Sequence, residues 1–159
     1  MCDPHLDHLD EYLRLAEAAG GPIGHIFETH LQADHHSAAQ ALAEITGATV
    51  YFHASAEVAF PHVAVADGDE IQLGNDYVRV LHTPGHTPES VCYLVGDRTR
   101  GEEPWFVLTG DSIFVGAIGR PDLAGREREM AGQLYDSLHR RILILPGEMD
   151  RIEAANLGG

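Results

Sequence analysis

Three short segments of the chain carry side chains that commonly bind metal ions, at residues 30–35, 84–88 and 109–111. Within them, His30, His86 and Asp111 supply two imidazoles and one carboxylate. Such a trio on one face of a ferrous ion leaves coordination positions open for a substrate and for dioxygen. The trio therefore predicts a metal-dependent enzyme and suits a mononuclear iron oxygenase. The same ligand types also bind zinc and manganese, so they do not identify the metal.

The three candidate ligands each lie beyond a predicted strand. Apolar and alternating residues predict strands at 23–29, 49–52, 71–73, 77–81, 91–95 and 105–109. His30 follows the first strand, His86 lies in the loop after the fourth, and Asp111 follows the last. Because strands hold the loops at their ends rigidly, we expect the three ligands to converge on one point.

Helices are predicted on both sides of these strands. The first has an apolar stripe of Leu6, Leu9, Leu13, Leu15 and Ala16. The second is capped by Ser37 and ends at Gly47, and its inward-facing residues are predicted to be Ala39, Leu42, Ala43 and Ile45. A third is predicted over residues 127–141. Consecutive strands between helices favour an α/β (α+β) fold of sheets covered by helices, in one domain of residues 1–159.

The composition limits the classes of partner. A formal charge of -15 disfavours binding to nucleic acid or to an anionic membrane. We find neither an apolar run of the roughly 20 residues that span a bilayer nor a secretory signal, so the cytoplasm is the simplest location. Two cysteines are too few for a disulfide framework. Of these, Cys92 lies on an apolar predicted strand and is expected to be buried.

Longer motifs surround the candidate ligands: Thr29-His30-Leu31-Gln32-Ala33-Asp34-His35, Thr83-Pro84-Gly85-His86-Thr87-Pro88-Glu89-Ser90, Leu108-Thr109-Gly110-Asp111 and Gly119-Arg120-Pro121-Asp122-Leu123. Together they resemble the metallo-β-lactamase superfamily and, within it, the persulfide dioxygenases, which are related to glyoxalase II. The resemblance implies an αββα sandwich with a single Fe(II) held by His30, His86 and Asp111. The implied reaction is oxidation of glutathione persulfide by O2 to sulfite and glutathione, as in sulfide detoxification.

The first motif departs from the superfamily's usual His-x-His-x-Asp-His pattern, because Gln32 replaces the second histidine. By resemblance, the full pattern serves two metals, so Gln32 favours one. Its amide is expected to bond a metal-bound water or a ligand carboxylate, or to fill the space of the lost ligand. Asp34 and His35 are expected to form a vestigial second site, to orient ligands or to make structural hydrogen bonds. Arg120 is the candidate for anchoring an anionic substrate group or bracing the site, with a structural salt bridge to Asp122 or a nearby acid as its alternative role.

Two other functions remain open from the sequence. A zinc-dependent hydroxyacylglutathione-type thioester hydrolase would use the same fold with a metal-activated hydroxide, although Gln32 argues against it. An inactive sulfur-sensing or interaction module would keep the fold without the metal, although the intact trio argues against that. The sequence does not decide whether a rhodanese-type sulfur carrier delivers the persulfide, or whether the chain forms a homo-oligomer.

The resemblance also predicts that terminal strands of the family's fold are missing from the chain. The family's domain normally has strands before the Asp-Pro pair that appears here as Asp3-Pro4, and this chain has almost no residues before that pair. At the other end, residues 145–147 lead at once into a tail that resembles the family's extreme carboxyl end. We therefore expect a sandwich with fewer terminal strands than the family usually has.

Overall fold

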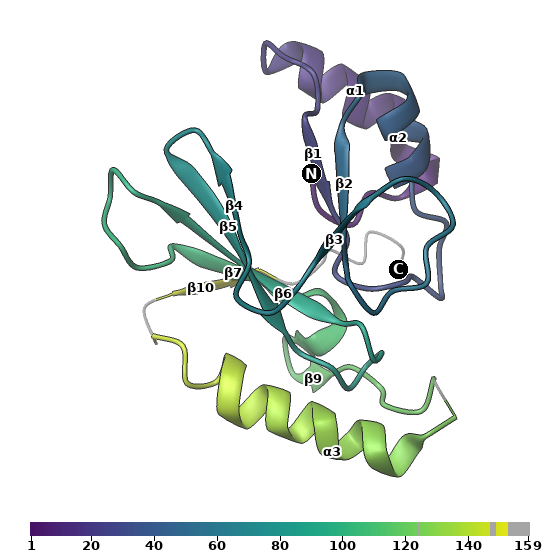
Figure 1. The fold of residues 1–159 in the computed structure, drawn as a ribbon, viewed down its shortest axis with the longest axis vertical. Helices are drawn as coiled ribbons and strands as arrows, with labels where there is room; N and C mark the ends of the chain where they lie inside the picture. The colour runs from purple at the N-terminus through teal and green to yellow at the C-terminus, as the bar shows by residue number, and fades with distance from the viewer. Residues whose placement is uncertain (124, 147–148, 153–159) are drawn as a thin grey trace.

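The computed structural model describes residues 1–123, 125–146 and 149–152 (Figure 1). Its helices are α1 (Leu9–Ala18), α2 (Ala39–Thr46) and α3 (Glu127–Ser137), with 3-10 segments at Leu6–His8 and Gly110–Ser112 and a π segment at Leu138–Ile142. Its strands are β1 (His25–Phe27), β2 (Thr49–His53), β3 (Val63–Val65), β4 (Glu70–Leu73), β5 (Asp76–His82), β6 (Val91–Asp97), β7 (Phe106–Leu108), β8 (Ile113–Phe114), β9 (Ala117–Ile118) and β10 (Asp150–Ile152). The predicted helices and strands are confirmed, with shifted ends.

The strands form two sheets and a separate hairpin. The first sheet has the order β1-β2-β3 and is parallel. The second has the order β10-β7-β6-β5-β4 and is antiparallel except for the pair of β10 and β7. Figure 1 shows α1 and α2 along the first sheet and α3 along the second. The layers therefore follow the order αββα, as predicted.

Three apolar clusters hold these layers together. One lies between the first sheet and its two helices, one between the sheets, and one between the second sheet and α3. Because successive strand residues face opposite sides, Ile26 packs toward the helices whereas Phe27 packs toward the second sheet. Buried members of the clusters include Ile26, Leu42, Val80, Tyr93, Val107, Leu134 and Ile142. Each such side chain contributes about 1.5–3 kcal/mol by leaving water.

Three apolar positions differ from the sequence prediction. Leu6, in the 3-10 segment before α1, is 40% exposed, Leu15 is 55% exposed and Ile45 is 58% exposed, so their predicted place on a buried face is wrong. Leu15 follows Leu13 by two residues, and a helix turns about 100° per residue, so the two side chains point to opposite sides. Ile45 lies beside the buried stripe that contains Ala39 and Leu42. The helical angle explains the exposure of Leu15, whereas Ile45 lies at the edge of the buried face and was assigned to the core by its hydrophobicity.

The predicted burial of Cys92 is confirmed. Cys92 is fully buried, and burial raises the pKa of its thiol to about 11. No helix within the described ranges is long and apolar enough to cross a membrane.

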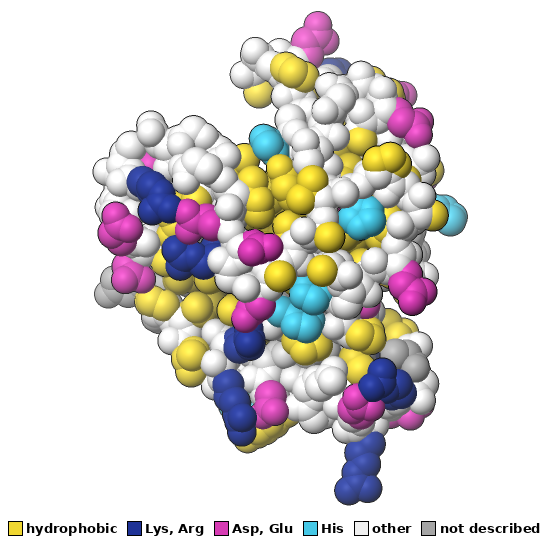
Figure 2. Space-filling view, viewed as in Figure 1, with side chains coloured by type: hydrophobic (Ala, Val, Ile, Leu, Met, Phe, Trp, Pro, Cys, Tyr) yellow, Lys and Arg dark blue, Asp and Glu magenta, His cyan; other side chains and the backbone are white. Residues whose placement is uncertain are grey.

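Arginine and acidic side chains lie close together over the region of β4 and β5 (Figure 2), where Arg79 and Arg98 both pair with Glu70. Part of the basic charge is thus neutralised locally.

Candidate metal centre

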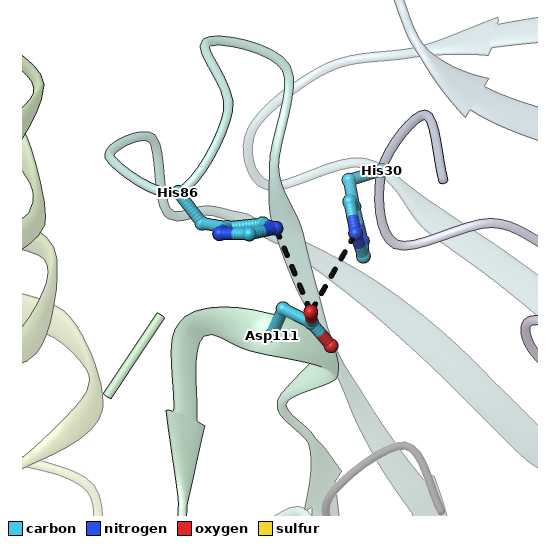
Figure 3. Close-up of side chains that lie close together, drawn as sticks. All are labelled: His30, His86 and Asp111. Atoms are coloured by element: carbon cyan, nitrogen blue, oxygen red, sulfur yellow. Dashed lines mark ion pairs between the residues drawn. The ribbon is translucent and has the colours of Figure 1, made fainter. Parts of the chain in front are cut away.

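Three loops bring His30, His86 and Asp111 together (Figure 3). His30 follows β1, His86 lies between β5 and β6, and Asp111 lies in the 3-10 segment after β7. Their candidate ligand atoms lie within 4.8 Å of one another. Asp111 Oδ2 is 3.5 Å from His86 Nε2 and 4.0 Å from His30 Nε2. The loops converge on one point, and the role of the trio as metal ligands remains a prediction.

The ring of His30 is oriented by Thr29 and Asp3. His30 Nδ1 lies 2.9 Å from the hydroxyl of Thr29, and that hydroxyl donates a 2.9 Å hydrogen bond to Asp3 Oδ2. Since the hydroxyl gives its single proton to Asp3, it accepts from Nδ1, and the lone pair of His30 lies on Nε2. Burial, assisted by the nearby His86, lowers the pKa of His30 to about 4. The imidazole is therefore neutral at pH 7 and presents Nε2 toward Asp111.

The backbone of Arg120 orients the second histidine. His86 Nδ1 lies 3.0 Å from the Arg120 carbonyl oxygen. A carbonyl only accepts, so Nδ1 carries the proton and the lone pair lies on Nε2. The backbone at residues 119–120 can approach His86 this closely because residue 119 is glycine. A Cβ there would overlap the Asp111 carbonyl oxygen and lie 3.0 Å from His86 Cβ.

Asp111 is the most accessible member of the trio, with 28% of its side chain exposed. Burial raises its pKa, although the nearby His86 acts in the opposite direction. The preceding residue, Gly110, has a φ of +48°, and a Cβ there would overlap Oγ1 of Thr29. The segment that carries Asp111 therefore packs against the same threonine that orients His30.

The donor set fits a divalent metal ion. Bonds of about 2.0–2.2 Å from one ion to nitrogen and oxygen ligands place the donor atoms about 3.0–3.5 Å apart. The separations of 3.5 and 4.0 Å reach this range after small side-chain movements. In the part of the chain that the structure describes, no other group of His, Cys, Asp or Glu meets the same criterion.

The hydrogen bonds of Gln32, Asp34 and His35 go to residues other than the trio. Gln32 Nε2 donates to Asp3 Oδ1 over 3.3 Å, so the amide joins the carboxylate that orients Thr29. Asp34 Oδ1 and His35 Nδ1 lie 3.1 Å apart, and the His35 ring stacks on His5. Within the described residues, the buried Nε2 of His35 has no hydrogen-bond partner. The predicted roles of these residues beside a metal are not tested by these contacts.

Arg120 holds a bidentate salt bridge with its side chain. Nε lies 2.6 Å from Asp122 Oδ1 and Nη2 lies 2.8 Å from Asp122 Oδ2. The hydrogen bond from Arg120 lowers the pKa of Asp122 to about 2. The salt bridge considered from the sequence is present, and the role of Arg120 as a substrate anchor stays a prediction.

A pocket of about 450 Å³ opens beside the trio. It is lined by His30, Ala33, Asp34, His86, Asp111, Phe114, Ile118, Gly119, Arg120 and Leu123. Phe114 and Ile118 come from the β8–β9 hairpin and, with Leu123, give the pocket an apolar side. The volume lies within the range of about 300–1,000 Å³ that is usual for small-molecule sites. The pocket therefore provides room for a small molecule next to the candidate ligands.

Sequence reasoning assigned no role to several residues that shape this centre. Thr29 and Asp3 are hydrogen-bonded although 26 positions separate them, and Gly119 touches two ligands from another loop. In the sequence, only the position of Thr29 directly before His30 could have indicated its role. Asp3 gives no local signal, since its partner is distant in the sequence.

Solved structures share this fold. The crystal structure of a metallo-β-lactamase from Staphylococcus aureus matches 99% of this chain with a TM-score of 0.89 and 36% identity, and the match covers 48% of that chain. ETHE1 from Myxococcus xanthus matches 99% of this chain and 65% of its own, with a TM-score of 0.85 and 37% identity. TTHA1623, solved in a di-iron-bound form, matches 96% of this chain and 79% of its own, with a TM-score of 0.74 and 28% identity.

Curated relatives represent two activities of this superfamily. A hydroxyacylglutathione hydrolase from Francisella philomiragia is 34% identical over 114 residues, which are 71% of this chain and 42% of the relative. The human mitochondrial persulfide dioxygenase ETHE1 is 26% identical over 148 residues, which are 93% of this chain and 55% of the relative. The chain thus spans about half the length of these relatives. No family model matches it. From the αββα layers and the similarity over nearly its whole length, we conclude that the chain belongs to the metallo-β-lactamase superfamily.

Proposed function

We propose that this chain carries the metal centre of an iron-dependent persulfide dioxygenase. The observation that carries the proposal is the convergence of His30, His86 and Asp111, with both Nε2 lone pairs turned toward the carboxylate. Similarity to two ETHE1 proteins supports it. Since the chain spans only part of those relatives, the activity and the substrate are both part of the proposal.

The proposed cofactor is one Fe(II) per chain, with zinc as the alternative. Two neutral imidazoles and a carboxylate would hold it and leave the remaining positions to face the pocket. Gln32 supports a single ion, because an amide replaces the imidazole of the usual two-metal pattern, and the structure joins this amide to Asp3. The similar protein TTHA1623 binds two irons, which supports iron but not the stoichiometry.

In the proposed reaction, glutathione persulfide, O2 and water give glutathione, sulfite and two protons. The S–S bond breaks, glutathione leaves as the thiolate, and the terminal sulfur is oxidised while O2 is reduced. The bound iron supplies the redox chemistry with O2, which no side chain of this pocket offers. His30, His86 and Asp111 fix its position, and the apolar side formed by Phe114 and Ile118 limits water around the reacting sulfur.

Arg120 is proposed as the anchor for an anionic group of the substrate, because it lines the pocket. To bind a substrate carboxylate, the Arg120 guanidinium would release Asp122. It would then make the same kind of bidentate contact with the substrate. Arg120→Ala is expected to raise the KM for glutathione persulfide more than it lowers kcat. An unchanged KM would leave Arg120 with only its salt bridge.

The deciding experiment combines metal analysis with oxygen uptake. Protein purified without air should contain about one iron per chain, and adding glutathione persulfide should start oxygen consumption that His86→Ala abolishes. A matched control is His139→Ala, since His139 is exposed on the π segment and does not line the pocket. Iron-loaded protein without oxygen uptake would refute the dioxygenase.

A zinc-dependent thioester hydrolase is the second candidate, because the Francisella relative is a hydroxyacylglutathione hydrolase. In that case the same centre would activate a water molecule as the nucleophile. Two zincs per chain with hydrolysis of a glutathione thioester would favour this candidate. An inactive sulfur-sensing module predicts neither activity, and a rhodanese-type carrier and self-association stay predictions for the active protein.

A further inference from the structure

Glu89 is a buried acidic residue outside the candidate ligands and outside the pocket lining. It is 7% exposed, and glutamate is rarely buried this deeply without a partner. Its Oε1 accepts a 3.1 Å hydrogen bond from the backbone N–H of Leu31, which is 58 positions away in the sequence. The buried carboxylate therefore holds the residue that directly follows His30.

Other hydrogen bonds hold the chain just before His30. The Val91 N–H donates to the Thr29 carbonyl over 2.8 Å, and the Tyr93 hydroxyl donates to the Glu28 carbonyl over 2.8 Å. These contacts fix the approach to His30 on β6, whereas Glu89 fixes the peptide that leaves it. The backbone is held on both sides of His30, which restricts the direction of its side chain.

Glu89 is also rigidly connected to His86, three residues earlier in the same loop. The loop closes through hydrogen bonds from the Thr83 N–H to the Ser90 carbonyl, 2.9 Å, and from the Thr87 N–H to Ser90 Oγ, 3.0 Å. The hydrogen bond to Leu31 therefore links this loop to the one that carries His30. The ring centroids of His30 and His86 lie 4.9 Å apart, and the two ring planes make an angle of 81°.

We propose that Glu89 is a positioning residue that sets the spacing of His30 and His86 around one metal ion. The inference rests on the metal centre of the proposed function, but it concerns metal binding and not the reaction with persulfide. Glu89 acts through the backbone of Leu31 and touches neither the metal nor the substrate. A carboxylate that accepts from a backbone N–H makes a stronger hydrogen bond than a neutral acceptor does. Loss of groups that orient metal ligands typically costs about 10–100-fold in metal affinity.

The test measures Co(II) binding to metal-free protein by visible absorption and by competition with a chelator. Glu89→Ala removes the hydrogen bond, whereas Glu89→Gln keeps an oxygen that accepts from the Leu31 N–H. Glu44→Ala is the matched control, because it removes the same charge from an exposed position on α2. The melting temperature of each metal-free variant reports its folding separately.

We expect Glu89→Ala to raise the Kd for Co(II) about 10–100-fold and to change the Co(II) absorption spectrum. Glu89→Gln should restore most of the affinity, and Glu44→Ala should leave it unchanged. Wild-type affinity in Glu89→Ala, or an equal loss in Glu89→Gln, would overturn the inference. Wild-type protein that binds no Co(II) would overturn the metal centre as well. If the Glu89 effect is present but persulfide causes no oxygen uptake, only the proposed reaction fails.

Discussion

Gly119→Ala should damage the metal centre through a single added methyl group. Gly119 lies where one backbone segment passes both Asp111 and His86. The new Cβ would overlap the Asp111 carbonyl oxygen and lie 3.0 Å from His86 Cβ, and both of these atoms are backbone or directly attached to it. Neither neighbour can move aside by simple side-chain rotation. The segment, and with it the Arg120 carbonyl that orients His86, must move instead.

The expected cost follows from this overlap. Overpacking of a well-packed site costs about 1–3 kcal/mol, which lowers the melting temperature of a chain of this size by roughly 2–12 °C. Displacement of the Arg120 carbonyl should also weaken metal binding by about tenfold or more. Gly132→Ala is the matched control, because Gly132 lies on the exposed side of α3 and a Cβ there meets nothing within 4 Å. In a helix interior that change should stabilise the protein by about 0.5–1 kcal/mol.

Both variants would be compared by thermal unfolding without metal and by Co(II) titration. We expect Gly119→Ala to lose stability and metal affinity, and Gly132→Ala to gain stability with unchanged affinity. An unchanged melting temperature and Kd in Gly119→Ala would refute the close approach of this segment to the ligands. Lower stability with an unchanged Kd would show that the contact supports the fold alone.

Three further predictions test other contacts. Thr29→Val should raise the Kd for Co(II) about tenfold in titrations, while Thr29→Ser, which keeps the hydroxyl, should bind as the wild type does. Partial burial of Asp67 is outweighed by its hydrogen bonds with Arg141 and the His82 N–H, which hold the pKa of its carboxyl below the ordinary value. Asp67→Asn should therefore cost about 0.5 kcal/mol in denaturant unfolding at pH 7, a difference that shrinks as the pH falls through that lowered pKa. Iodoacetamide at pH 8 should leave Cys92 unmodified in the folded protein and alkylate it in denaturant, as mass spectrometry would show, because burial raises its thiol pKa to about 11.

The sequence predicted most helices and strands and the convergence of the trio because both depend on local patterns. His30, His86 and Asp111 each follow a strand whose apolar residues are visible in the sequence. The order of the layers came from the resemblance, since alternation alone does not specify which strands pair. The short strands β3, β8, β9 and β10 were not predicted, because two or three residues show no reliable periodicity.

The residues that orient the candidate ligands could not be predicted from the sequence, for a different reason. Asp3 bonds to Thr29 across 26 positions, and Glu89 bonds to Leu31 across 58. Such contacts depend on how distant loops meet and have no spacing that a single chain reveals. Gln32 illustrates the same limit. Its type suggested a contact with a metal-bound water or a ligand carboxylate, or a space-filling role, and its hydrogen bond to Asp3 could not be read from the sequence.

Arg120 divides its contacts between backbone and side chain. Only its carbonyl reaches His86, whereas its guanidinium reaches Asp122. Since every amino acid has the same carbonyl, the side chain at this position can be exchanged while the hydrogen bond that orients the imidazole is kept. Position 120 is therefore a natural choice for saturation mutagenesis aimed at changing substrate preference, because the variants should still load metal.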